Sequence, residues 1–270
     1  MDINEFYVGE NENPLDKLVV DGGFCGIFRS IAVVGDSLAS GEFEGTNPET
    51  NATTFHDMYD YSWGQFLARM AGTTVRNFSR GGMSAVGYTV NFAYQNRLWD
   101  ADKACQAYII ALGVNDISQM VNGQIEFGDV SDINLENYVF NKKTFTGCYA
   151  EIIQRYRAIQ PDAKFFLMTI PETPGGEEKR RELAQKHSEL LYKLAEMFDN
   201  TYVLDMRKYS PKWDAKFKEN YFLGGHMNPM GYQLAAKIVA SYIDYIIRKN
   251  PKDFKQVGFI GTPYKNTKSV

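Results

Sequence analysis

The sequence has few cysteines and no long apolar run. Its three cysteines, Cys25, Cys105 and Cys148, stand far apart, without the spacing of a disulfide framework or a zinc site. No run of about 18 apolar residues is present that could span a membrane. The first residues also lack the basic and apolar regions of a secretory signal. We therefore expect a cytoplasmic protein without membrane partners.

An excess of charge of one sign is also missing. The 29 basic and 33 acidic side chains give a net charge of −4, so a nucleic-acid partner is not expected. Hydrophobic residues make up 44% and charged residues 23%, which excludes disordered, collagen-like and coiled-coil proteins. The 270 residues can bury a full core without disulfides or metals. We predict a single domain over residues 1–270.

Apolar runs typical of strands alternate with runs of helical period. Strands are expected at residues 30–34, 73–78, 107–112, 164–170 and 202–204, and helices at 61–71, from about 146 to 160, at 177–198 and from 229 to 250. Ser62 and Pro229 suit the first positions of their helices. Continuous apolar strands between helices predict a parallel sheet covered on both faces. Ligands of such sheets bind beyond the carboxyl ends of the strands.

Three stretches do not fit this alternation. Residues of about 42–60 and 118–143 read as loop insertions, and residues 250–270 read as a surface-packed C-terminal extension. Between Arg29 and Arg69 the chain has six acidic residues and no basic one. The insertions are either solvated loops or the walls of a pocket, and the sequence leaves both interpretations open.

The segments that follow the strands carry the side chains that acyl transfer needs. Ser37 follows the first strand, Gly82 the second and Asn115 the third, while His226 stands just before the last helix. Together they offer a hydroxyl, a flexible backbone N–H, a carboxamide and an imidazole. A serine attacks only when a base takes its proton, and the oxyanion that forms needs preorganised donors.

These segments resemble four sequence blocks of the SGNH hydrolases, also called GDSL esterases or lipases. The blocks are Gly35-Asp36-Ser37-Leu38, Asn77 with Gly82-Met83-Ser84, Gly113-Val114-Asn115-Asp116, and Gly225-His226-Met227-Asn228, and the resemblance covers roughly residues 30–245. It implies that Ser37 is the nucleophile, that His226 is the general base, and that the Ser37 N–H, the Gly82 N–H and the Asn115 amide form the oxyanion hole. It also implies a flavodoxin-like three-layer α/β/α sandwich with a five-stranded parallel sheet, and no metal or organic cofactor.

The chain departs from the family pattern at one position. The family usually has an aspartate three residues before the histidine, where this chain has Leu223. The Nδ1–H of a catalytic histidine needs an acceptor that orients the ring. We expect a main-chain oxygen near Leu223 or Gly224 to accept from His226. Asp205, at the end of the fifth strand, is the alternative supporting acid, ahead of Glu219.

The remaining candidates have structural explanations. His187 lies on the apolar stripe of a long helix and is expected to pack, and His56 lies in the acidic stretch and is expected at the surface. Asp36 is expected to form the hydrogen bonds that hold its turn. Trp63 is expected in the core.

The function that follows is that of a serine esterase. We expect it to hydrolyse short-chain acyl esters, with O-acetyl groups on a carbohydrate as the foreseen substrate, because the acidic and polar insertions offer no apolar channel for a long acyl chain. The missing aspartate keeps a second interpretation open, a catalytically weak relative that binds a carbohydrate or another ligand. An acyltransferase with the same site is a third. The oligomeric state and the exact ester are not encoded in any pattern.

Overall fold

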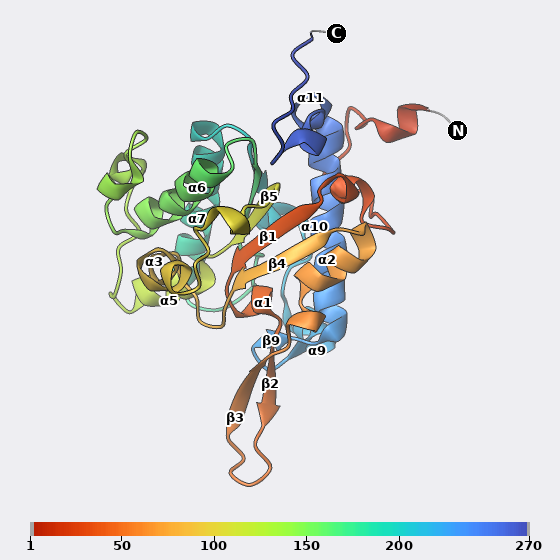
Figure 1. Ribbon diagram of the computed structural model, residues 1–270. Helices are drawn as coiled ribbons and strands as arrows, with labels where there is room; N and C mark the ends of the chain where they lie inside the picture. Colours follow the sequence, from red (N-terminus) through yellow and green to blue (C-terminus); the bar gives the residue numbers. More distant parts are fainter. Residues whose placement is uncertain (1–2, 269–270) are drawn as a thin grey trace.

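The computed structural model describes residues 3–268. Its centre is a five-stranded parallel sheet in the order β4-β1-β5-β6-β7 (Figure 1). The strands are β1 (Ser30–Gly35), β4 (Thr74–Ser79), β5 (Ala107–Ala111), β6 (Lys164–Met168) and β7 (Thr201–Leu204). This is the flavodoxin-like order, in which the point where the chain reverses direction lies between β1 and β5. The predicted fold class is confirmed.

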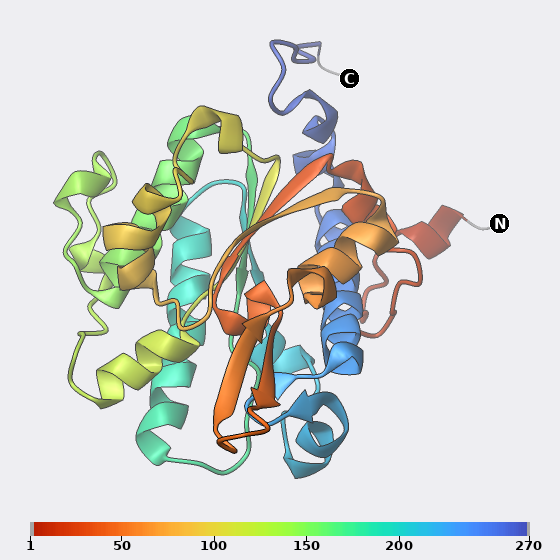
Figure 2. The same ribbon diagram turned by 60° about the horizontal axis from the view of Figure 1, so that its bottom comes forward.

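Helices cover both faces of this sheet (Figures 1 and 2). One face carries α2 (Trp63–Ala71) and α10 (Pro229–Lys249), and the other carries α6 (Phe145–Ile159) and α7 (Glu178–Met197). The side chains of β1 alternate between the two cores: Ile31 and Val33 pack on the first, Ala32 and Val34 on the second. Both faces of the strand are therefore apolar, as a sheet between two helix layers requires.

Local signals place the starts of the helices. The Ser62 hydroxyl accepts a hydrogen bond from the Gln65 N–H at the start of α2, and Asn228 caps α10 ahead of Pro229. Pro251 follows the end of α10 and opens the short helix α11 (Pro251–Phe254), because proline needs no N–H partner at a first helical position. Within residues 3–268, no helix is long and apolar enough to cross a membrane.

Several short elements had no periodic signal in the sequence. They are α1 (Ser37–Ser40), α3 (Ala85–Gly87), α4 (Ala93–Gln95), α5 (Val114–Val121), α8 (Met206–Tyr209), α9 (Ala215–Tyr221), β8 (Phe222–Leu223) and β9 (His226–Met227). α5 runs into the second expected insertion, whose remainder contains 3₁₀ turns at Val130–Asp132 and Tyr138–Phe140. Elements of two to eight residues are too short to display a helical or strand period.

The first insertion is a β-hairpin rather than a loop. It consists of β2 (Glu42–Thr46) and β3 (Thr53–Asp57), paired antiparallel, and it projects from the carboxyl end of the sheet (Figure 1). The C-terminal extension lies at the opposite end. There the Arg29 guanidinium donates to the carbonyls of Gly258 and Ile260 at 2.8 and 2.9 Å. The extension therefore packs on the molecule as expected, away from the carboxyl end of the sheet.

Candidate active site

Ser37 stands at the first residue of α1, directly after β1. Asp36 caps this helix, and its Oδ1 accepts a hydrogen bond from the Leu38 N–H at 3.1 Å, which confirms the turn-holding bond expected for it. Asp36 is buried, and burial raises the pKa of its carboxyl to about 6. The cap holds Ser37 on the sharp turn between strand and helix.

Gly82 lies in a tight turn after β4. The Met83 N–H donates to the Arg80 carbonyl at 3.2 Å, and Gly82, the third residue of this turn, has a φ of 72°. Such a φ favours glycine, because a Cβ would meet its own backbone there. A Cβ placed on Gly82 would have no neighbouring heavy atom within 4 Å. The backbone at Gly82 therefore faces open space in which a substrate can lie.

Asn115 and Asp116 open α5 after β5 and link it to the Gly82 loop. The Asn115 amide donates to the Met83 carbonyl at 3.0 Å, and one of its two hydrogens remains for another acceptor. Both oxygens of Asp116 accept from the Ala85 N–H, at 2.9 and 3.1 Å. Asp116 is fully buried, and burial raises its pKa to about 7. Two of the three expected oxyanion donors, Gly82 and Asn115, are thus part of one connected loop pair.

His226 lies in β9, which pairs with β8 so that His226 is opposite Leu223. The Leu223 side chain is apolar and exposed, so it offers the ring no hydrogen-bond acceptor. α1 packs against both β9 and β2, and this brings the element of Ser37 beside that of His226. Between residues 3 and 268, however, no hydrogen bond joins the Ser37 Oγ to the His226 ring.

Two carboxylates of the hairpin flank the His226 ring instead. Glu44 Oε1 lies 2.8 Å from Nδ1, and Glu42 Oε1 lies 3.0 Å from Nε2. The His226 and Glu42 side chains are each 14% exposed and that of Glu44 is 20% exposed. The prediction of a main-chain oxygen at Nδ1 is therefore wrong. A side-chain carboxylate reaches that nitrogen from 182 residues away in the sequence.

Asp205 does not support His226. Its Oδ1 accepts from the Thr169 hydroxyl and the Lys208 N–H, each at 3.1 Å, and its Oδ2 accepts from the Tyr192 hydroxyl at 2.8 Å. It caps α8 and holds the loop after β7. Its position at the carboxyl end of a strand was weak evidence for Asp205 as the supporting acid, since residues at such positions also serve as helix caps.

The other two histidines have the roles expected from the sequence. His56 is exposed on β3, and His187 is fully buried in α7, where its Nε2 lies 3.0 Å from the Leu112 carbonyl oxygen. Burial lowers the pKa of His187 to about 4. The sequence did contain a signal for the two glutamates that were missed. Both belong to the acidic stretch, and Glu-Phe-Glu at 42–44 has the alternation of a strand with one polar face.

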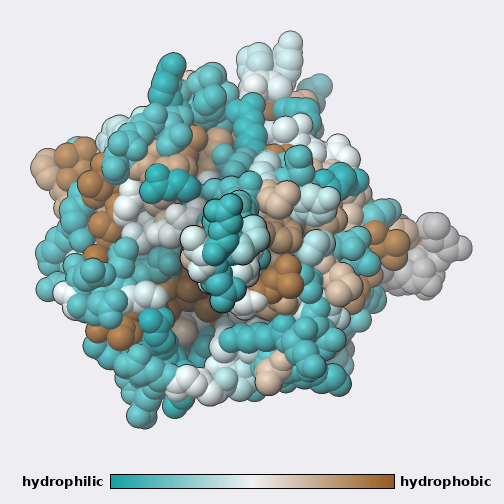
Figure 3. Space-filling model, turned by 90° about the horizontal axis from the view of Figure 1, so that it is seen from below, coloured by the Kyte–Doolittle hydropathy of each residue, from teal (hydrophilic) through white to brown (hydrophobic). Residues whose placement is uncertain are grey.

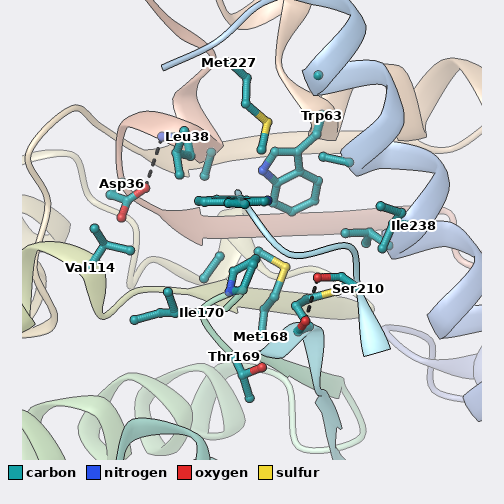
Figure 4. Close-up of a pocket in the computed structure, with 18 of the residues that line it drawn as sticks. Asp36, Leu38, Trp63, Val114, Met168, Thr169, Ile170, Ser210, Met227 and Ile238 are labelled. Carbon is teal, nitrogen blue, oxygen red and sulfur yellow. Dashed lines mark hydrogen bonds between the residues drawn. The ribbon is translucent and has the colours of Figure 1, made fainter. Parts of the chain in front are cut away.

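An apolar pocket lies beside these residues, between the sheet and α10 (Figure 4). Leu38 and Val114, the neighbours of Ser37 and Asn115 in the sequence, line one part of it. Further lining residues are Trp63, Met168, Ile170, Trp213, Met227 and Ile238. Trp63 is thus in the core, as expected, and also faces the pocket. The pocket was missed because its walls come from the sheet, α10 and the loops after β6 and α8, and not from the insertions.

Three comparisons relate the chain to known proteins. The family model described as GDSL-like Lipase/Acylhydrolase family matches residues 33–234. No curated protein sequence matches the chain. Three similar solved structures are a family two carbohydrate esterase from Clostridium thermocellum in complex with cellohexaose, a carbohydrate esterase family 2 enzyme plus carbohydrate binding domain from Corynascus thermopiles (Myceliophthora fergusii), and the acetyl xylan esterase AlAXEase.

These structures resemble the chain in fold. The Clostridium esterase is 20% identical with a TM-score of 0.57, over 81% of this chain and 64% of that one. The Corynascus enzyme is 17% identical with a TM-score of 0.53, over 80% and 65%. The acetyl xylan esterase is 16% identical with a TM-score of 0.52, over 79% and 99%. This chain therefore spans about two thirds of the first two proteins.

The flavodoxin-like sheet, with three sequence blocks after its strands and the fourth just before α10, defines an SGNH hydrolase, a class of ester-hydrolysing enzymes. The match of the family model extends over most of the chain. The chain belongs to the GDSL-like lipase/acylhydrolase family.

Proposed function

We propose that this protein hydrolyses esters through an acyl-enzyme on Ser37, with His226 as the general base. The observation that carries the proposal is the meeting of four elements at one end of the sheet: α1 with Ser37, the Gly82 turn, the start of α5 with Asn115, and β9 with His226. Ligands of doubly wound sheets bind at this end, at the switch point between β1 and β5.

In the proposed reaction the Ser37 Oγ attacks the ester carbonyl while His226 Nε2 takes the Ser37 proton. The N–H groups of Ser37 and Gly82 and the Asn115 amide stabilise the oxyanion, an effect worth about 10²–10³ in rate for each donor. His226 then gives the proton to the leaving alcohol. Water attacks the acyl-enzyme by the same route and releases the acid. None of these steps needs a metal or an organic cofactor.

We propose a short acyl group on a carbohydrate as the substrate, with O-acetyl groups foremost. Support comes from the family match and from the likeness of fold to carbohydrate esterases and to an acetyl xylan esterase. The acidic stretch supplies Glu42 and Glu44 against the histidine ring, and Asp57 lies beside Glu42 on the paired strand. A neutral sugar ester tolerates such surroundings, whereas an anionic ester would be repelled by them.

A second candidate differs in acyl length, and the apolar pocket favours it. The pocket begins at Leu38 and Val114, beside the proposed nucleophile and oxyanion hole, and its lining is almost entirely apolar. An acyl chain of several methylene groups would gain about 0.8 kcal/mol for each one it buries. The same catalytic groups would then act on medium-chain esters.

A panel of p-nitrophenyl esters from acetate to palmitate tests both candidates. Ser37→Ala is expected to abolish turnover and labelling by a fluorophosphonate while the unfolding transition is retained. The highest kcat/KM on acetate supports the short-chain proposal, and a maximum on longer chains supports the second candidate. A folded Ser37→Ala variant with normal turnover would refute the mechanism. Failure of the wild type to be labelled would favour the ligand-binding relative, and ester formation with an added alcohol would favour an acyltransferase.

A further inference from the structure

The hairpin presents two glutamates to His226 because side chains alternate along a strand. Glu42 and Glu44 share one face of β2, and Phe43 points to the other. The Phe43 ring packs against those of Tyr61 and Tyr232, with centroids 6.0 and 5.6 Å away. The Tyr232 hydroxyl also donates to the main-chain oxygen of Glu42 at 2.7 Å. The root of the hairpin is therefore anchored, and its acidic face is held toward β9.

Glycines on the facing loops make room for the two carboxylates. A Cβ at Gly224 would overlap Glu44 Oε2, and a Cβ at Gly81 would overlap Glu42 Oε2. The Gly225 N–H donates to Glu44 Oε1 at 2.6 Å, a second bond beside the one to His226 Nδ1. Glu44 is thus held at two points of the histidine loop, while Glu42 lies between His226 Nε2 and the Gly81-Gly82 loop.

The two ring nitrogens have different tasks in the proposed reaction. Nδ1 must carry its proton toward an acceptor, which sets the tautomer and orients the ring. Nε2 must be free to accept the Ser37 proton. Glu44 satisfies the first need, and its charge would stabilise the imidazolium that forms. Glu42 conflicts with the second, because an acceptor at Nε2 favours a proton on that nitrogen before the serine can supply one.

We propose that Glu44 is the positioning acid of His226, in place of the aspartate that is absent at position 223, and that Glu42 holds Nε2 in the substrate-free protein and withdraws when an ester binds. This inference rests on the proposed function. Glu42 has a flexible side chain at the edge of the site, and the space beside Gly82 is open. An ester carbonyl placed on the oxyanion donors would displace the Glu42 carboxylate from the Gly81 side.

The test uses matched substitutions in one hairpin. Glu44→Gln and Glu42→Gln each remove one charge, and Glu49→Gln removes a charge from the exposed far turn of the same hairpin. Each variant is assayed for kcat and KM on p-nitrophenyl acetate and for its rate of Ser37 labelling by a fluorophosphonate. Thermal unfolding monitors folding in parallel.

Glu44→Gln is expected to lower kcat by between about 10²- and 10⁴-fold with a smaller change in KM. Glu44→Asp should recover part of that loss. Glu44→Asp keeps the carboxylate charge beside His226. Recovery of kcat in this variant therefore indicates that Glu44 positions the histidine and does not only support the hairpin, even if Glu44→Gln unfolds. Glu42→Gln is expected to raise the labelling rate at least about twofold, because more molecules have a free Nε2. Glu49→Gln should match the wild type.

The outcomes separate the inference from the proposed function. A kcat for Glu44→Gln within about twofold of wild type, while Ser37 is still labelled, would overturn the role of Glu44 alone. A labelling rate that is unchanged or reduced in Glu42→Gln would overturn the role of Glu42. Loss of labelling in the wild type would overturn the proposed function itself, independently of either glutamate.

Discussion

At the scale of single residues, the environment of His226 distinguishes this site from the usual family pattern. Its two nitrogens face two carboxylates from one strand, whereas the aspartate expected three residues upstream is Leu223. Burial raises the pKa of Glu42, as do the like charges of Asp57 and Glu44, while His226 opposes this shift. A carboxyl in such surroundings gives up its charge more readily, which agrees with its proposed withdrawal from Nε2.

The Asn115 amide provides the sharpest prediction at this scale. Asn115→Ala is expected to lower kcat by roughly 10²-fold with a smaller change in KM, because a hydrogen bond to the oxyanion strengthens as charge develops. Steady-state kinetics on a p-nitrophenyl ester measures this. Asn122→Ala, on the exposed end of the same helix, is the control. A change confined to KM would assign Asn115 to substrate binding instead.

At the scale of elements, the site depends on contacts between short segments. The start of α5 is joined to the turn after β4 through Asn115 and Asp116. The hairpin is joined to α10 through Phe43 and Tyr232. The Ser40 hydroxyl of α1 donates to Asp57 at the end of β3 at 2.5 Å. Each functional loop is therefore held by a neighbour that is distant in the chain.

Phe43→Ala tests whether the hairpin root controls the histidine. We expect a loss of about 1–3 kcal/mol in the free energy of unfolding, because a half-buried aromatic contact is removed. We also expect a fall in kcat, although the Phe43 side chain points to the other face of β2 from Glu44, because Glu44 loses its support. Denaturant unfolding and kinetics provide the two measurements. Phe140→Ala, 70% exposed in the second insertion, should change stability by no more than about 0.5 kcal/mol. An unchanged kcat in a destabilised Phe43→Ala would separate the anchor from catalysis.

At the scale of the whole molecule, buried titratable groups gather near the carboxyl end of the sheet. Burial raises the pKa of Asp36 to about 6 and that of Asp116 to about 7, and it lowers that of His187 to about 4. The two raised carboxyl pKa values remove stability as the pH rises from about 4 to 7. The lowered histidine pKa has the opposite effect, since its contribution is complete above about 6.5 and is lost as the pH falls toward 4. The two effects partly offset each other.

His187→Gln isolates the histidine, because both aspartates remain in the variant. Glutamine can still donate to the Leu112 carbonyl but does not titrate. The stability of the wild type relative to this variant is expected to decrease by up to about 3 kcal/mol between pH 7 and pH 4. Urea unfolding at several pH values measures the difference. A difference that does not change with pH would mean that His187 titrates normally in the folded protein.

Local sequence determined the strands, the long helices and four of the proposed site residues. Runs such as Ile31–Val34, the cap at Ser62 and the glycine turn at Gly82 act between neighbours in the chain, so a single segment reveals them. The blocks around Ser37, Asn115 and His226 follow strands or precede a helix, and parallel strands bring their carboxyl ends together. The sheet and the location of the site could therefore be predicted.

Only the tertiary structure decided what surrounds His226 and where the apolar pocket lies. Glu44 is 182 residues from His226 in the sequence. No local sequence pattern predicts their contact or the packing of Phe43 that holds the hairpin against β9. The pocket likewise forms between the sheet, α10 and the loops after β6 and α8, whose residues carry ordinary core patterns. Contacts between distant segments depend on how the elements pack, and the physical preferences of a single segment do not contain that information.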